Sequence, residues 1–550
     1  DKIYASGVIT KSVSVVKELV ENSIDAKASE IKIELKESGT KMIKVTDNGI
    51  GMSKEDALLA FERHATSKLL SEFDLFRISS LGYRGEALPS IAAISKVILK
   101  TCNSNIGTEI SINGGIFNYQ KASDARVGTS IEVSDIFYNT PARLKFMNSL
   151  YSELANIVEY INKMALSYPN IKFKITNYNK VLLNTDGNDN ILKNIKEIYG
   201  TDIARKMINV EGYNDDYDIY GYISMPEITK SNRNNIITFV NKRLVRNNEL
   251  NRTMLEVYNR YIPENRYPII VLNIICDPSF IDVNIHPSKM DVKFSQFNNL
   301  KDLVSKKIKE ALDSNLLIPS IESKEKSSDN KTYTNLTFDI EREFSIEEKA
   351  DVFEKVVLPE LYSVGLVSGT YIICQNESGM YIIDQHAAKE RINLEKYIKN
   401  LSNVTKSVTS LLVPLILEFP KNEFILINKN IDVLIKLGLD ISEYGNNAFI
   451  IKKHPTWLLN GYEEESIKKI LEVFIEENKN FSYEKFIDNV AETLSCKLAI
   501  KANENISISE MESLINDLRK CDNPYTCAHG RPTIIFYSNY ELEKLFKRVM

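Results

Sequence analysis

Three polar side chains at helical spacing are the first residues in this chain whose types could do chemistry. Glu18, Asn22 and Asp25 are separated by four and three positions, so a helix places them on one face. A carboxylate there can take a proton from an attacking water, and an amide oxygen four residues on can bind magnesium without adding charge. A solvated polar face has the same spacing, and this helix alone favours that simpler interpretation.

Glycine-rich segments downstream make a nucleotide site a better interpretation than a solvated polar face. The segment 47–51 (DNGIG) follows an expected strand, and its glycines permit a tight, close-approach backbone. Its aspartate can accept a hydrogen bond from the amino group of adenine, although by itself an Asp-Gly turn is the more common explanation. The segments 64–68 (HATSK) and 82–88 (GYRGEAL) are followed by a Gly-Thr pair at 128–129. Their amides could wrap phosphates as a closing lid.

Four such motifs in this order resemble the GHKL ATPases, a superfamily that includes gyrase-type topoisomerases, histidine kinases, certain heat-shock chaperones and MutL. Within it, VVKELVENSIDA, TDNGIGM, RHATSK and GYRGEALPSIA look like the MutL family. NTPARLKF (139–146) and DVNIHPSKMDVKF (282–294) are similar to signatures of that family outside the nucleotide pocket. The resemblance implies ATP and Mg²⁺ as cofactors.

The resemblance also implies roles for individual residues. Glu18 would activate the hydrolytic water, Asn22 would hold Mg²⁺, Asp47 would read adenine, and Lys289 would reach the terminal phosphate from a second subdomain. The other expected nucleotide-binding residues are Gly49, Gly51, Thr66, Ser67, Lys68, Gly82, Arg84, Gly85, Gly128 and Thr129. At 6–7 and 11–12 the chain has Ser-Gly and Lys-Ser where the family usually has Gly-Glu and Arg-Pro, a difference that bears on ATP turnover.

A second group of candidate ligands lies in the C-terminal half. His386 and Glu390 are four positions apart at an expected helix start, with Asp384 just before it, so the imidazole and the carboxylate share a face. An acidic helix cap gives a similar pattern. Three more candidates follow downstream, namely Cys496, Cys527 and His529. Soft and hard donors together suit zinc or manganese. For any single residue, a buried cysteine or a satisfied histidine is the simpler explanation, and we reject it only for the set.

This set resembles the endonuclease site of bacterial MutL proteins that nick DNA themselves. The matching positions are Asp384, His386, Glu390, Glu395, Cys496, Cys527, His529 and the terminal segment 546–548. The resemblance implies that Asp384 and Glu390 are catalytic, that manganese is the catalytic ion, and that zinc is structural or regulatory. A bound metal lowers the pKa of water for in-line attack on a phosphodiester. Differences from the family at Ser495, Lys497 and Ala528 remove no expected ligand.

A basic stretch in the middle of the chain is a candidate DNA contact. Its residues are Lys242, Arg243, Arg246 and Arg252. Phosphate contacts there would give salt-sensitive, sequence-independent binding. A solvated face is nearly as good an interpretation, but FVNKRLVRN resembles a family segment associated with DNA. The resemblance further implies a homodimer, a MutS mismatch sensor and a sliding clamp as partners. In the clamp-type segment TSLLVP, Thr409 stands where the family often has glutamine, which weakens the clamp prediction.

Composition sets limits on these interpretations. A chain of 550 residues needs several hydrophobic cores, and 43% apolar with 26% charged residues is typical of a soluble globular protein. No stretch has the apolar length of a membrane span, and 1–16 lacks signal-peptide features, so we expect a cytoplasmic location and no membrane partner. Six scattered cysteines favour reduced thiols or metal ligands. A net charge of -5 restricts DNA contact to a local basic groove.

Hydrophobic periodicity predicts a multidomain α+β protein. We expect a helix over 12–24, strands over 31–35, 42–47, 97–101, 108–112 and 130–133, and a helix over 54–63 opened by a capping box of Ser53 and Asp56. The polar segment 314–350 is expected to be a flexible linker. The expected domains are a GHKL ATPase α/β sandwich (1–203), a ribosomal-S5-like transducer and DNA-binding subdomain (204–313), and an α+β C-terminal dimerisation and endonuclease domain (351–550) with an inserted regulatory subdomain (415–490).

More local expectations complete the domain prediction. The segment 415–490 is expected to be helical, and the chain is expected to end in a strand and a short basic helix. The functional hypothesis is an ATP-dependent dimeric mismatch-repair clamp that couples MutS to incision by its own nicking site. A nuclease-inactive, ATP-switched matchmaker is the alternative, and the complete ligand set argues against it. A histidine kinase or topoisomerase would need a phosphoacceptor helix or a strand-cleaving tyrosine domain, and the sequence has neither signature.

Overall fold

The computed structural model describes residues 9–62, 87–103, 106–124, 126–144, 149–263, 265–282, 292–315, 358–402, 407–445, 447–458, 461–477, 481–499, 506–527, 531–546 and 548. The chain divides into two compact units. One contains Asp1–Leu316, Val408–His454 and Phe474–Lys479, and the other contains Leu317–Ser407, Pro455–Val473 and Asn480–Met550. Among the described residues, no helix combines the length and apolar character needed to cross a membrane.

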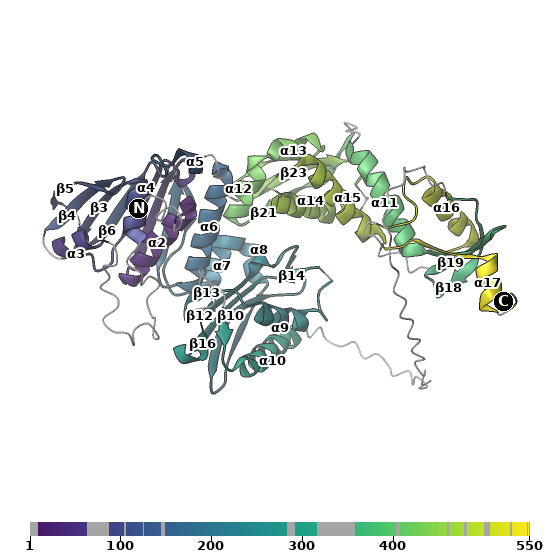
Figure 1. The fold of residues 1–550 in the computed structure, drawn as a ribbon, viewed down its shortest axis with the longest axis horizontal. Coiled ribbons are helices and arrows are strands. Elements are labelled where there is room, and N and C mark those ends of the chain that lie inside the picture. Colours follow the sequence, from purple (N-terminus) through teal and green to yellow (C-terminus); the bar gives the residue numbers. More distant parts are fainter. Residues whose placement is uncertain are drawn as a thin grey trace. The chain divides into compact units, whose positions relative to one another are not determined.

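An eight-stranded sheet forms the body that carries the first candidate site (Figure 1). Its order is β5-β4-β3-β6-β2-β1-β7-β8, and neighbours are antiparallel except for the parallel pair β1 and β7. The strands are β1 (Glu30–Lys36), β2 (Met42–Asp47), β3 (Lys96–Cys102), β4 (Gly107–Asn113), β5 (Ile116–Ser123), β6 (Gly128–Ser134), β7 (Lys172–Asn177) and β8 (Lys180–Asn184). All the strands expected in this body are present.

Helices pack against this sheet, and the alternating burial of β1 marks the side that is covered. In β1, Ile31, Ile33 and Leu35 are buried and alternate with exposed residues, as expected for a half-covered sheet. The helices of this body are α2 (Ser12–Asp25), η1 (Glu37–Gly39), α3 (Lys54–Leu59), α4 (Ala87–Ile94), α5 (Pro141–Leu144), α6 (Leu150–Ser167), α7 (Ile191–Tyr199) and α8 (Thr201–Arg205). One bond of the expected capping box is present, since Ser53 Oγ accepts from the Asp56 N–H at 3.0 Å, and α3 ends at Leu59, four residues before the expected end. The predicted α/β sandwich is confirmed.

A five-stranded sheet forms the next part of the same unit. Its order is β13-β12-β15-β10-β9, antiparallel except for β12 beside β15. Leu250, Met254 and Tyr258 of one helix and Leu300 and Ile308 of another complete its core. The elements are β9 (Met207–Tyr213), β10 (Tyr217–Ser224), β11 (Thr229–Lys230), η3 (Arg233–Asn235), β12 (Ile236–Val240), β13 (Arg243–Val245), α9 (Asn248–Tyr258), β14 (Tyr267–Pro268), β15 (Ile270–Cys276), η4 (Pro278–Phe280), β16 (Ile281–Asp282), β17 (Lys293–Phe294) and α10 (Phe297–Asn315). The linker predicted from position 314 therefore begins inside a helix, and 316–350 lies outside the described residues.

The segment predicted to be helical over 415–490 is only partly so. A three-stranded sheet, ordered β21-β23-β22, occupies its first part. The elements are β21 (Val408–Glu418), α12 (Lys421–Lys429), α13 (Ile431–Lys436), β22 (Asp440–Tyr444), β23 (Ala448–Pro455), α14 (Glu463–Glu477) and the start of α15 (Tyr483–Ala499). The all-helical prediction was wrong because the segment contains the end of β21, β22 and β23, and a short apolar run such as 449–451 fits a strand as well as a buried helix.

A four-stranded antiparallel sheet, ordered β18-β19-β20-β24, organises the second unit. Its elements are β18 (Tyr362–Val367), β19 (Tyr371–Asn376), β20 (Gly379–Asp384), α11 (Gln385–Ser402), α16 (Ile508–Arg519), β24 (Ile534–Ser538) and α17 (Asn539–Leu545). Ile372, Ile383 and Ala388 pack with Met511 and Ile515 in its core. The last helix was predicted to be basic, but α17 contains two glutamates and one lysine, so that prediction was wrong.

Glu109 lies at the centre of a charge network across three strands of the first sheet. Lys100 on β3 and Lys121 on β5 stand opposite it in register, and each Nζ is 3.1 Å from a Glu109 carboxylate oxygen. The Tyr119 hydroxyl donates to the same carboxylate at 2.9 Å. Burial acts to raise the pKa of Glu109, but the hydrogen bonds from Tyr119, Lys121 and Lys100 lower it to about 2.

Glu109→Gln should therefore lower the free energy of unfolding at pH 7, by about 1 kcal/mol for a network of this exposure. A lowered carboxyl pKa stabilises the folded chain above the unfolded value near 4.5, and this stabilisation disappears as the pH falls towards 2. Urea unfolding of the full chain from pH 7 to 2 measures the difference. Glu34→Gln is the control, because its 3.9 Å pair with Lys44 is exposed. A difference that is constant with pH would contradict the assignment.

Candidate functional site

The carboxylate of Asp47 is contacted by three elements of the body built on the eight-stranded sheet. It lies at the end of β2, and Ser23 on α2 donates its hydroxyl to Oδ2 at 2.8 Å. The backbone N–H groups of Gly49 and Thr129 donate to Oδ1 at 2.9 and 3.3 Å. Burial raises the pKa of Asp47, and these three donors oppose that rise. The carboxylate is therefore held in one orientation by α2, by its own loop and by β6.

The loop after Asp47 is wedged between α2 and the end of β3. Asn48 Oδ1 accepts the N–H groups of Ser29 and Glu30, both at 2.9 Å, and the Ile50 N–H donates to the Ala26 carbonyl at 3.0 Å. Gly51 has φ +66°, and a Cβ there would lie 2.0 Å from the carbonyl oxygen of Cys102. A free Asp-Gly turn would not need this close approach, so the packing favours a built loop over a simple turn.

The expected catalytic face lies on α2. Val15, Val16, Leu19 and Val20 are buried in the core, while Glu18, Asn22 and Asp25 are half-buried beside them. Asn22 precedes Ser23, whose hydroxyl contacts Asp47, so one helix carries the expected base, the expected magnesium ligand and an anchor of the expected adenine-reading residue. The described part of the chain thus brings α2 together with the Asp47 loop and the start of β6.

Several expected nucleotide-binding residues lie outside the described residues. They are Thr66, Ser67, Lys68, Gly82, Arg84, Gly85 and Lys289. Gly128 and Thr129 are described and lie beside Asp47, and a Cβ at Gly128 would lie 2.2 Å from the Asp47 carbonyl oxygen. The expected phosphate-covering segments and Lys289 therefore stay predictions. Gly49, Gly51, Gly128 and Thr129, by contrast, are described and form the floor of the candidate site, which is the backbone packed around Asp47.

Two polar residues that the sequence did not single out support this floor. Ser23 donates to Asp47, and the Thr101 hydroxyl accepts from the Met52 N–H at 2.9 Å and donates to the Gly128 carbonyl at 3.2 Å. Both residues are buried. A serine next to the apolar stripe of a helix and a threonine at an inward-facing strand position are polar residues where apolar ones are expected. That signal was in the sequence and would have identified them.

The second candidate site starts where β20 passes directly into α11. Asp384 Oδ1 accepts the N–H groups of His386 and Ala387 at 2.8 and 3.1 Å, so this residue does cap the helix. His386 Nε2 lies 3.2 Å from Glu390 Oε1, and Glu390 is 6% exposed. The spacing of four residues therefore brings the imidazole and the carboxylate into contact, as the sequence predicted.

The thiol ligands of this candidate site are only partly described. Cys527 is buried, and its N–H donates to the Arg531 carbonyl at 2.8 Å. Cys496 lies on α15, which packs along α11, but its side chain and His529 lie outside the described residues. Among the residues that are described, no three His, Cys, Asp or Glu side chains form a group that could hold a metal. The His386–Glu390 pair is the assembled part, and its donor types fit zinc or manganese.

Two of the expected DNA-binding residues lie at the turn between β12 and β13. The Lys242 carbonyl accepts the Ser167 hydroxyl at 2.6 Å, and the Lys242 ammonium lies 5.6 Å from the centre of the Tyr168 ring. Burial, with the charges of Asp25 and Glu21, raises the pKa of Tyr168 to about 12, and Arg243 acts in the opposite direction. Arg246, just after β13, is exposed. The turn therefore packs against the end of α6 while keeping basic groups at the surface.

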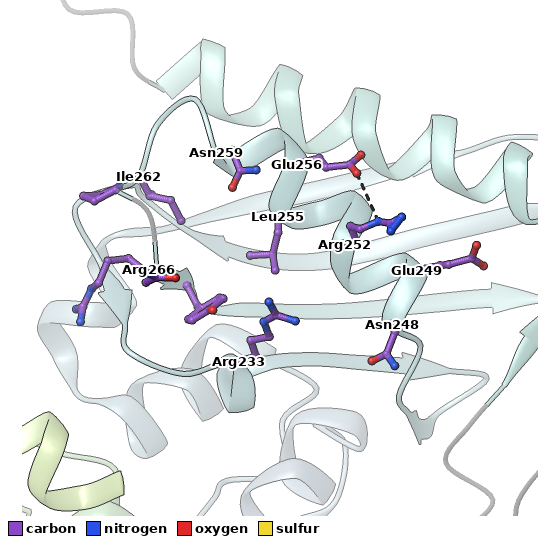
Figure 2. Close-up of a pocket in the computed structure, with 12 residues that line it drawn as sticks. Arg233, Asn248, Glu249, Arg252, Leu255, Glu256, Asn259, Ile262 and Arg266 are labelled. Atoms are coloured by element: carbon purple, nitrogen blue, oxygen red, sulfur yellow. Dashed lines mark ion pairs between the residues drawn. The ribbon is translucent and has the colours of Figure 1, made fainter. Parts of the chain in front are cut away.

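Arg252, the last expected DNA-binding residue, lines a hollow of about 620 Å³ on α9 (Figure 2). Arg233 and Arg266 line the same hollow, together with Glu249 and Glu256. Arg252 Nε lies 3.7 Å from Glu256 Oε1. The surface around Arg252 is therefore of mixed charge, unlike the basic run that the sequence suggested.

Three sequence families match the chain. They are described as a histidine kinase-, DNA gyrase B- and HSP90-like ATPase (10–132), a DNA mismatch repair protein C-terminal domain (195–313) and a MutL C-terminal dimerisation domain (364–506). These matches and the α/β sandwich define a GHKL-type ATPase joined to a dimerisation domain.

Full-length relatives identify the family. A DNA mismatch repair protein MutL of Listeria innocua is 42% identical over 591 residues, covering 100% of this chain and 98% of that protein. Another, from a Geobacillus species, is 40% identical over 608 residues with the same coverage. The crystal structure of the N-terminal domain of a DNA repair protein matches 57% of this chain at 27% identity, with a TM-score of 0.50. The chain belongs to the MutL family of DNA mismatch repair proteins.

Gly51→Ala should lower the melting temperature more than a glycine-to-alanine substitution at a position where an added Cβ meets no other atom. The positive φ costs about 1 to 2 kcal/mol for a residue with a Cβ, and the contact with Cys102 adds to this. Gly445→Ala is the matched control, because Gly445 has φ +75° but no atom within 4 Å of an added Cβ. Calorimetry of the full chain measures both. Equal losses in the two variants would show that the Gly51 contact relaxes without effect.

Proposed function

We propose that this protein is an ATP-dependent dimeric clamp that couples mismatch recognition by MutS to DNA incision with its own metal-dependent nicking site. Membership of the MutL family, with its ATPase and dimerisation domains, supports the coarser part of this proposal. The observation that carries the incision part is the 3.2 Å contact between His386 and Glu390, directly after Asp384. A scaffold without nuclease activity would not need this pair at a helix start.

In the proposed ATPase cycle, Glu18 would take the proton of the attacking water, Asn22 would hold Mg²⁺ and Asp47 would accept a hydrogen bond from adenine. The fixed orientation of Asp47 supports its part, because Ser23, Gly49 and Thr129 occupy the carboxylate from three sides. Gly49, Gly51, Gly128 and Thr129 form the floor, and the proposed lid consists of Thr66, Ser67, Lys68, Gly82, Arg84 and Gly85. Lys289 is proposed to couple the second subdomain to the nucleotide.

In the proposed nicking site, the residues that would hold metal ions are Asp384, His386, Glu390, Cys496, Cys527 and His529. Bound ions of this kind supply a water of lowered pKa for attack on the phosphodiester, and manganese and zinc are the proposed ions. Asp384 already accepts two helix N–H groups through Oδ1, which fixes the carboxylate at the start of α11. Glu390 is nearly buried, so it is shielded from bulk water beside His386.

Exposed apolar residues support self-association of the second unit. On the β18-β19-β20-β24 sheet, the exposed ones include Tyr362, Val364, Val367, Ile535 and Phe536. A second copy covering this sheet agrees with the matched dimerisation domain.

DNA is proposed to bind at Lys242, Arg243, Arg246 and Arg252.

The proposed clamp segment lies on β21. Leu412 and Val413 are exposed there, as is Thr409. A sliding clamp would bind the exposed Leu412 and Val413 side chains. Thr409, at the first position of this segment, lacks the side-chain amide that a glutamine would offer to the clamp.

Glu18→Ala should leave ATP binding intact and reduce steady-state turnover by about 100-fold or more, since a general base contributes at least that factor. Phosphate release and equilibrium nucleotide binding, measured on the same full-length preparation, separate the two effects. Glu55→Ala, at an exposed position of α3, is the control and should behave like the parent protein. Turnover at the parental rate in Glu18→Ala would remove Glu18 from the proposed role.

Supercoiled plasmid incubated with the protein and Mn²⁺ should become relaxed circles, and Asp384→Asn should lower the rate by about 100-fold or more, because a neutral ligand weakens metal activation of water. Gel densitometry over time gives the rates. Asp440→Asn, at an exposed position of β22, should cut like the parent. Cutting by Asp384→Asn at the parental rate would overturn the site assignment, and a parent that leaves plasmid supercoiled would favour the matchmaker alternative.

A further inference from the structure

Glu21 is a third carboxylate of α2, beside the residues proposed for ATP hydrolysis. Glu18, Glu21 and Asp25 are separated by three and four positions. Because an α-helix turns by roughly 100° per residue, Glu21 stands roughly 60° to one side of Glu18, and Asn22 stands roughly 40° to the other. Carboxylates one turn apart on a helix repel each other, and the phosphates of a nucleotide add more negative charge. The direction of the Glu21 side chain therefore matters for the proposed site.

Tyr160 of α6 holds the Glu21 side chain in one direction. The two helices pack against each other, and the Tyr160 hydroxyl donates to Glu21 Oε1 at 3.3 Å. Lys17, one turn before Glu21 on α2, places its Nζ 3.9 Å from the same oxygen. The Glu21 side chain is 13% exposed, whereas that of Lys17 is 41% exposed. The Glu21 carboxylate is therefore held on the flank of α2 that α6 covers.

The hydroxyl of Tyr160 is a well-placed donor. Ile157 and Ile161, its neighbours on α6, are fully buried in the core of this body, so the helix that carries the hydroxyl is packed in place. Burial, with the negative charges of Glu21 and Glu18, raises the pKa of Tyr160 well above its ordinary value. The hydroxyl therefore stays protonated and remains a donor at neutral pH.

We propose that Tyr160 is a positioning residue that keeps the Glu21 carboxylate turned away from Mg·ATP, so that the face carrying Glu18 and Asn22 is open to the nucleotide phosphates. This inference rests on the proposed ATPase site. Tyr160 acts through Glu21 and not by touching the substrate. Without the hydroxyl, the carboxylate has the freedom to turn along α2 towards the phosphates, where its charge opposes the binding of ATP.

ATP affinity and turnover of the full-length protein test this role. Tyr160→Phe removes the hydroxyl and keeps the ring. We expect it to raise KM for ATP, and Kd for a nonhydrolysable ATP analogue, about threefold to tenfold, which corresponds to the loss of one hydrogen bond. The change in kcat should be less than about twofold, because only binding is weakened. Tyr151→Phe, at an exposed position of the same helix, is the control and should match the parent.

A double-mutant cycle with Glu21→Gln separates this role from a structural one. Glutamine has no charge to bring near the phosphates, so Tyr160→Phe should change ATP affinity by less than about twofold when Glu21→Gln is also present. Salt gives a second readout, because screening should reduce the difference between Tyr160→Phe and the parent. A purely structural role would lower the melting temperature without this dependence on charge and salt.

Lys17→Gln is the variant to use if Tyr160→Phe does not fold. It removes the ammonium near Glu21 Oε1 from an exposed position, so its effect on folding is small. We expect KM for ATP to rise about twofold, as for an exposed ion pair, and not to rise when Glu21→Gln is also present.

Parental ATP affinity in the folded Tyr160→Phe protein, or in Lys17→Gln where it replaces that variant, would overturn the inference. An equal loss of affinity with and without Glu21→Gln would also overturn it. Failure of the proposed ATPase site is distinguishable, because the parent would then bind no ATP or Glu18→Ala would hydrolyse it at the parental rate. In that case both the site and the inference would fall. A parent whose turnover depends on Glu18 but not on Tyr160 would remove the inference alone.

Discussion

A half-buried carboxylate must find hydrogen bonds, and the architecture around the candidate nucleotide site depends on this constraint. Removing the Asp47 carboxylate from water is unfavourable unless donors replace the water. Here the donors come from α2, from the loop after β2 and from β6. These elements can reach one carboxylate only if their backbones approach closely, which is why glycine stands at positions 49, 51 and 128. Any nucleotide bound here would meet a floor already fixed by these contacts.

In the second unit, a single helix, α11, holds the candidate site residues in place. Successive faces of α11 serve two purposes: His386 and Glu390 contact each other on one, while Arg391 and Glu395 hold the 521–527 segment on the other. A single helix thus fixes both a ligand pair and the backbone of a third candidate ligand, Cys527. Charged side chains that are nearly buried need such complete hydrogen bonding. The backbone of Cys527 is therefore fixed by a hydrogen bond from Arg391, a residue next to Glu390 on the same helix.

Much of the local structure followed from periodicity. The amphipathic pattern of α2, the alternation in β1 and β2, and the capping box at Ser53 gave elements whose bounds agree with the structure within a few residues. The helical prediction over 415–490 failed at the end of β21 and in β22 and β23, where neighbouring helical patterns concealed the strands. Short apolar segments fit either a strand or a buried helix, and the sheet that receives them decides between the two.

The sequence by itself determined the family, the positions of the candidate ligands and the helical spacing that joins His386 to Glu390, because these depend on residue type and on contacts within one turn. Only the tertiary structure decided that Ser23 and Thr129 hold Asp47, that Lys242 packs on Tyr168, and that Glu395 binds backbone amides. Such pairs are far apart along the chain. No local pattern encodes them, because they form only when separate elements pack and each buried polar group must find a partner.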